Sequence, residues 1–123
     1  MKSWLLAAFL AAGAVLSAAE MTRPMAGKTA ILPLKDVKPG MQAVAWTVFQ
    51  GTVPEAVPVE IVGVWKNYLG PHGDVIIGKM LGRGKETNVA AGMSGSPVYV
   101  DGKLMGAVAL RMSVFSPLSL IHI

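Results

Sequence analysis

The fold of this chain is decided by the stretch Val98-Tyr99-Val100-Asp101-Gly102-Lys103-Leu104-Met105. Apolar segments flank the dipeptide Asp101-Gly102, which suits the positive φ angles that a type I′ turn requires. The stretch therefore predicts a β-hairpin whose second strand continues to Leu110. In the predicted register, Val100 pairs with Lys103 and Val98 pairs with Met105.

Shorter segments upstream of the hairpin show the same β-type pattern. Residues 43–49 are rich in Val, Trp, Thr and Phe, residues 57–65 alternate between apolar and other side chains, and Val75-Ile76-Ile77 is typical of a short buried strand. Segments rich in glycine and proline separate these stretches, and none shows a sustained helical period. We therefore expect a small domain that is mostly β.

Composition narrows the classes of function. The chain has 123 residues, 53% of them hydrophobic, which allows one domain and excludes intrinsic disorder. It has no cysteine, which excludes disulfides, thiolate metal sites and thiol nucleophiles. The net charge of +4 comes from scattered basic residues, so we expect no nucleic-acid partner. Two histidines and scattered carboxylates show no metal-ligand spacing, so we expect neither a metal nor another cofactor.

The chain begins with a segment typical of a Sec-type signal peptide. Lys2 precedes an apolar run, and Ser17-Ala18-Ala19 supplies the small residues that signal peptidase needs. The uncharged run over residues 3–19 has 17 residues, at the lower limit of the ~17–25 that a membrane span needs. We therefore expect a signal peptide at 1–19, cleavage before Glu20, a secreted or periplasmic product and no stable membrane span afterwards.

Immediately before the predicted hairpin lies the hexapeptide Gly92-Met93-Ser94-Gly95-Ser96-Pro97. Glycines flank Ser94 at positions −2 and +1, and glycine allows a tight or left-handed backbone without steric cost. Such a turn can project the Ser94 hydroxyl outward and direct backbone N–H groups into one concavity, which is the arrangement of an oxyanion hole. The alternative interpretation is a loop without catalytic function that leads into a strand, because such loops are also rich in glycine and serine.

This hexapeptide, followed by Val98 and by Asp101-Gly102-Lys103-Leu104-Met105-Gly106-Ala107-Val108, resembles the nucleophile region of the SpoIVB peptidase family. These enzymes are secreted serine endopeptidases of chymotrypsin-like type. The resemblance extends over about residues 43–110. It implies a half-barrel of antiparallel strands that ends in a β-hairpin, a peptide or protein substrate, Ser94 as nucleophile, and the N–H groups of Gly92 and Ser94 as oxyanion donors.

The partners of the nucleophile depart from the family pattern. In the family the catalytic histidine lies farther upstream than the matching region, and the acid ends the strand before the serine loop, where this chain has Lys79-Met80-Leu81. His72 is the one substitute base within the matching region, with Asp74 two residues further on. An exposed histidine without a catalytic role is the alternative interpretation of His72.

Three interpretations of the whole chain follow. The first is a serine endopeptidase domain of SpoIVB type that is incomplete as it stands, so that its status as an enzyme is open. The second is a non-catalytic peptide-binding module of the bacterial envelope, and the third is a fragment that does not fold alone. The predicted segments are a signal peptide at 1–19, an irregular linker at 20–41, the β domain at 42–115, and a tail at 116–123. Whether this tail belongs to the native protein is left open. Nothing in the sequence indicates the oligomeric state.

Overall fold

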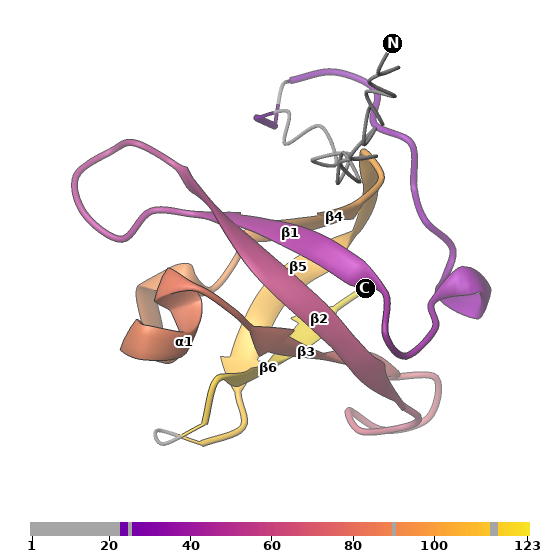
Figure 1. The fold of residues 1–123 in the computed structure, drawn as a ribbon. Coiled ribbons are helices and arrows are strands. Elements are labelled where there is room, and N and C mark those ends of the chain that lie inside the picture. The colour runs from indigo at the N-terminus through magenta and orange to yellow at the C-terminus, as the bar shows by residue number, and fades with distance from the viewer. Residues whose placement is uncertain (1–22, 25, 90, 114–115) are drawn as a thin grey trace, which may run out of the picture.

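The computed structural model of the protein describes residues 23–24, 26–89, 91–113 and 116–123. Within these residues, six antiparallel strands form a closed barrel in the order β1-β2-β3-β6-β5-β4 (Figure 1). The strands are β1 (Gln42–Thr47), β2 (Glu55–Trp65), β3 (Val75–Met80), β4 (Pro97–Val100), β5 (Lys103–Arg111) and β6 (Leu118–His122). The short helical elements are η1 (Leu34–Asp36), α1 (Arg83–Thr87) and η2 (Ala91–Met93). The prediction of a mostly β fold is confirmed.

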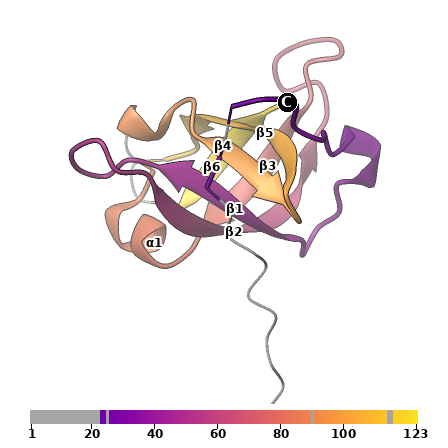
Figure 2. The ribbon, with the colours of Figure 1, turned by 90° about the horizontal axis from the view of Figure 1, so that it is seen from above.

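The chain follows a Greek-key path. Strands β1, β2 and β3 pair in sequence, and the connection through α1 and η2 then returns the chain so that β4 lies beside β1 (Figure 2). This spatial order, 4-1-2-3, is the Greek-key order. Its consequence for the site is that the segment before β4 enters the barrel next to β1, which is far from it in the sequence, and next to β5, which follows β4 in the hairpin.

The predicted hairpin forms, with one change of register. Asp101 and Gly102 have φ angles of +48° and +76°, as a type I′ turn requires, and Val100 pairs with Lys103. Val98, however, pairs with Gly106 and not with Met105, because β5 contains a bulge at this point. The bulge has a physical reason: Met105 and Val108 are three residues apart and both buried in the core, whereas a regular strand would direct them to opposite faces.

The segment predicted as a tail is a strand of the barrel. β6 pairs with β3 on one side and β5 on the other, and its residues Ser119, Leu120 and Ile121 are almost completely buried. The predicted domain boundary at 115 therefore lies too early, and the hairpin is not the last element. The segment has five residues, and three of them are buried in succession, so it lacks the alternating pattern by which a strand is identified.

The described part of the predicted linker is irregular but packs on the barrel. The Leu32 N–H donates to the Leu104 carbonyl at 2.9 Å, and Leu104 in turn donates to Ala30 at 2.8 Å. Leu32 and Val37 are buried as part of the hydrophobic core. The predicted signal peptide lies outside the described residues. Within the residues that the structure describes, no helix has the length and apolar character of a membrane span.

Candidate active site

The Ser94 turn, which we define as residues 92–97, joins η2 to β4. Gly95 has a φ of +86°, a left-handed conformation that disfavours residues with a Cβ. Its N–H donates to the Val108 carbonyl at 2.7 Å, and the Ser96 N–H donates to Met93 at 3.1 Å. Met93 is buried in the core, whereas Ser94 is exposed. The turn is thus anchored on both sides of a serine that faces solvent.

The Ser94 hydroxyl has one weak protein contact. Its Oγ donates to the carbonyl of Ala109 in β5 at 3.4 Å, which is long for a hydrogen bond between oxygens. This contact directs the hydroxyl toward the β5 backbone and supplies no base, since a carbonyl oxygen cannot take up the proton. The hydroxyl is therefore accessible and held loosely.

Two backbone amides of the turn are already engaged. The N–H groups of Gly95 and Ser96 donate to protein carbonyls, so they are not free to bind an oxyanion. The amides of Gly92 and Ser94 are the donors that the sequence predicts, and that role stays a prediction. Gly92 has no atom within 4 Å of the position that a Cβ would occupy, so the space beside it is open.

His72 does not lie near Ser94. Val75 pairs with His122, and His122 pairs with Ala107, so the start of β3 is level with Ala107 of β5. β3 and β5 run in the same direction, and His72 lies three residues before Val75, toward the beginning of β5. Ser94 contacts Ala109, which is displaced from Ala107 in the opposite direction. The structure therefore does not bring the predicted nucleophile and the predicted base together.

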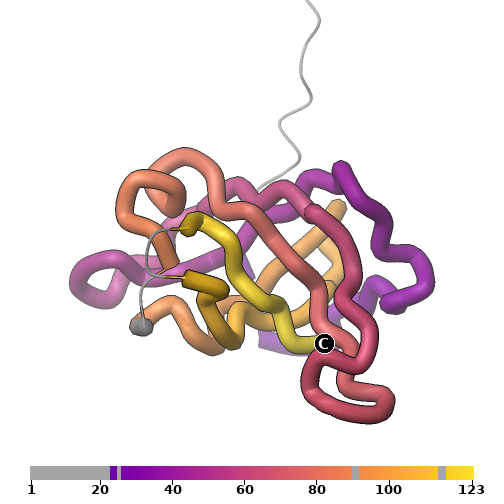
Figure 3. Tube along the Cα trace, turned by 90° about the horizontal axis from the view of Figure 1, so that it is seen from below, coloured from indigo at the N-terminus to yellow at the C-terminus, as the bar shows by residue number. Residues whose placement is uncertain are grey.

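The loop that carries His72 lies at the end of the barrel next to the C-terminus (Figure 3), whereas α1 lies at the opposite end (Figure 2). His72 lines an open hollow of about 420 Å³ with Asn67, Gly70 and Pro71. Asp74 accepts a hydrogen bond from the Asn67 N–H at 2.8 Å, so this carboxylate is engaged by the backbone. The other histidine, His122, is exposed in β6 beside Val75 and Ala107. Within the described parts of the chain, no group of three His, Asp or Glu residues is placed to bind a metal ion.

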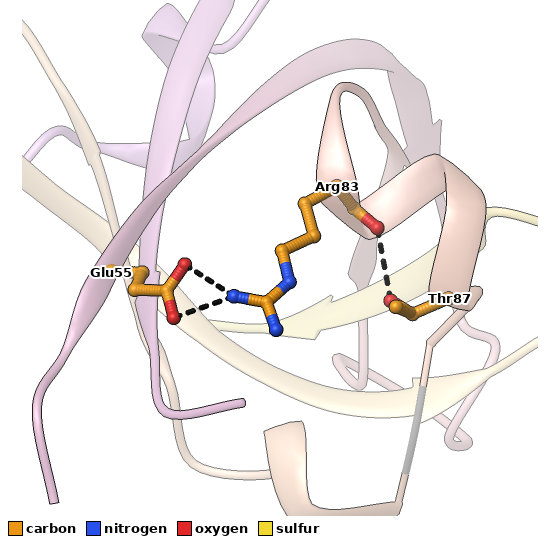
Figure 4. Close-up of polar contacts among 3 residues, drawn as sticks. All are labelled: Glu55, Arg83 and Thr87. Atoms are coloured by element: carbon orange, nitrogen blue, oxygen red, sulfur yellow. Dashed lines mark hydrogen bonds and ion pairs between the residues drawn. The ribbon is translucent and has the colours of Figure 1, made fainter. Parts of the chain in front are cut away.

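One polar cluster fixes α1 to the β1–β2 connection (Figure 4). Arg83 Nη1 donates to both carboxylate oxygens of Glu55, at 2.7 and 2.8 Å, and its guanidinium lies 4.5 Å from the ring centre of Phe49. The Thr87 hydroxyl donates to the Arg83 carbonyl at 3.0 Å. About half of the Arg83 side chain is exposed, so we expect the ion pair to contribute less than about 1 kcal/mol. The cluster joins α1 to the start of β2 at Glu55 and to Phe49 in the β1–β2 connection.

Thr47 is a buried residue of the site region that sequence reasoning missed. Its side chain is 4% exposed, and its Oγ1 makes no hydrogen bond within the described residues. Ala45 pairs with Val98, so the register places Thr47, two residues further along β1, level with Ser96. A buried hydroxyl without a partner is unusual and costs stability. No local pattern could have revealed it, because the pairing of β1 with β4 sets its environment.

We expect Thr47→Val to raise the free energy of unfolding by about 1 kcal/mol, because it removes an unpaired polar atom at nearly constant shape. Urea unfolding measures the change. The matched control is Ser119→Ala, which removes a buried hydroxyl that donates to the Gly78 carbonyl at 3.4 Å and should lower stability. A loss of stability in Thr47→Val as large as that in Ser119→Ala would show that the Thr47 hydroxyl has a partner.

Compared with protein-family models and with curated proteins, the chain matches none.

Proposed function

We propose that this chain is the nucleophile-bearing domain of a secreted or periplasmic serine endopeptidase of SpoIVB type. The observation that carries the proposal is the Ser94 turn, in which a glycine with positive φ and two anchored amides hold an exposed serine at the entry to β4. The hexapeptide sequence that resembles the SpoIVB nucleophile region occupies the same six residues.

The proposed chemistry is acyl transfer. Ser94 Oγ bonds to the carbonyl carbon of a peptide while its proton passes to a base, and the N–H groups of Gly92 and Ser94 stabilise the oxyanion. The C–N bond then breaks, the leaving amine takes the proton, and water releases the acyl group by the same two steps. Because the register separates His72 from Ser94, the proposal requires a base other than His72.

A fluorophosphonate probe tests the nucleophile. Ser94 Oγ displaces fluoride from phosphorus only where a base takes up its proton. In the protein that contains this base we therefore expect one adduct, mapped to Ser94 by peptide mass spectrometry and absent in Ser94→Ala, and we expect little labelling of the chain without it. Ser96→Ala is the matched control, because Ser96 is in the same turn but buried, and this variant should still be labelled. Labelling that persists in Ser94→Ala, or an adduct confined to other serines, would overturn the assignment.

Without a base, the chain alone should hydrolyse casein little or not at all. Cleavage that disappears in His72→Ala would contradict the separation of His72 from Ser94.

The alternative function, non-catalytic peptide binding by strand addition, needs an unpaired strand edge. Each strand of the closed barrel pairs with a neighbour on both sides, so unpaired backbone remains only at the strand ends. This pairing favours the peptidase proposal over the peptide-binding alternative.

A further inference from the structure

The β2–β3 tip, which we define as residues 65–74, exposes large apolar side chains. Trp65, Tyr68 and Leu69 are 44%, 42% and 51% exposed. The rings of Trp65 and Tyr68 contact each other with centres 4.8 Å apart and planes tilted by 54°. Two aromatic rings and an aliphatic side chain thus share one short loop at the end of the barrel away from Ser94.

Internal hydrogen bonds hold this loop in one shape. The Asn67 N–H donates to Asp74 Oδ1 at 2.8 Å, and the His72 N–H donates to Asn67 Oδ1 at 3.2 Å. The Leu69 N–H donates to the Gly73 carbonyl at 2.9 Å. The exposed side chains therefore stand on a preorganised loop, which lowers the entropy cost of binding a partner.

The charged groups of the tip differ in their exposure. Lys66 is exposed, and no ion pair among the described residues involves it. Asp74 is only partly exposed, and one of its carboxylate oxygens is engaged by the Asn67 N–H. His72 and the neighbouring His122 are exposed. The tip thus carries one lysine and one carboxylate beside its apolar rings, and Lys66 is the more exposed of these two charged groups.

We propose that the β2–β3 tip inserts into the headgroup region of a lipid bilayer that contains anionic lipids. Trp and Tyr favour the membrane interface, where the ring is apolar and its polar group stays hydrated, and an adjacent Lys is attracted to anionic headgroups. A protein partner fits less well, because the tip has ten residues and a stable protein interface uses roughly 20–30 on each side.

A position-specific label tests the insertion. The chain has no cysteine, so Leu69→Cys in the full chain can carry a single environment-sensitive nitrobenzoxadiazole dye. With vesicles of phosphatidylcholine and phosphatidylglycerol, we expect a several-fold rise and a blue shift in its emission, and quenching by lipids that carry a spin label near the headgroup. Val53→Cys is the matched control, because Val53 is a similarly exposed apolar residue in the β1–β2 connection.

The outcomes separate the tip from the N-terminal apolar segment, which is present in both labelled chains. Insertion predicts that the dye emission rises at position 69 but not at position 53. It also predicts a similar rise for a dye on Tyr68→Cys, and a smaller rise at position 69 when Trp65→Ser is added. No rise at either tip position, or an equal rise at positions 69 and 53, would overturn the proposal. A rise that depends on protein concentration without vesicles would assign the tip to self-association and would overturn it as well.

Discussion

Replacing Ile121 by Ala is expected to lower the free energy of unfolding by about 2–5 kcal/mol, the range for truncating a fully buried aliphatic side chain. Ile121 is 0% exposed and lies in β6 between Ile76 of β3 and Val108 of β5. Its side chain is part of the core, so the cavity would open at the strand that closes the barrel. A domain of this size has a total stability of roughly 5–15 kcal/mol, so the variant loses a large fraction of it.

Urea unfolding followed by circular dichroism measures this loss. The chain offers a close control in Ile123→Ala, because Ile123 lies two residues further on and is 48% exposed. We expect the control to change stability by less than about 0.5 kcal/mol. Equal small effects of the two substitutions would mean that β6 does not close the barrel in solution.

The second large decrease in the free energy of unfolding is expected for Gly106→Ala. A Cβ on Gly106 would lie against the backbone oxygen of His122, much closer than two such atoms can approach. The oxygen belongs to the β5–β6 pairing, in which His122 is the partner of Ala107, so it cannot move aside without breaking that pairing. We expect a loss of about 3 kcal/mol, at the upper end for an overpacked site.

Gly63→Ala is the control for this substitution. Gly63 is also a strand glycine, in β2, but the nearest atom to its Cβ position is Pro39 Cγ at 4.0 Å. The new methyl group has room there, so thermal unfolding should show a much smaller change for Gly63→Ala than for Gly106→Ala. A Gly106→Ala variant as stable as the parent would contradict the close approach of β5 and β6.

The parts of the fold that local sequence predicts are those whose partners are near in the chain. Asp101-Gly102 and its two flanking apolar segments contain both strands of the hairpin, so a short stretch is sufficient. β6 is different: it pairs with the nearby β5 (Arg111 with Ser119), but Ser119, Leu120 and Ile121 are buried in succession. The segment therefore lacks the alternating pattern that identifies a strand, and its pairing with β3 joins residues about forty positions apart (Ser119 with Gly78). The bulge in β5 also depends on the core that surrounds Met105 and Val108, which exists only once the barrel has closed.

The same distinction applies to the candidate site. The glycines around Ser94 predict an exposed serine in a tight turn, and the structure has this geometry. Thr47 and Arg83 were not predicted, because Thr47 lies near the Ser94 turn through the β1–β4 register and Arg83 meets Glu55 across 28 positions of sequence. His72 was chosen as a base by elimination among two histidines, and spacing in sequence cannot reveal at which end of a barrel a loop lies.

The position of β6 in the chain constrains how the protein is assembled in the cell. A chain synthesised from its N-terminus delivers β1 to β5 first, and until residues 118–122 follow, β3 and β5 each keep one edge without a partner. Open strand edges pair readily with other chains. The nascent protein therefore exposes two strand edges until β6 arrives, and a delay in the synthesis of residues 118–122 should increase its aggregation.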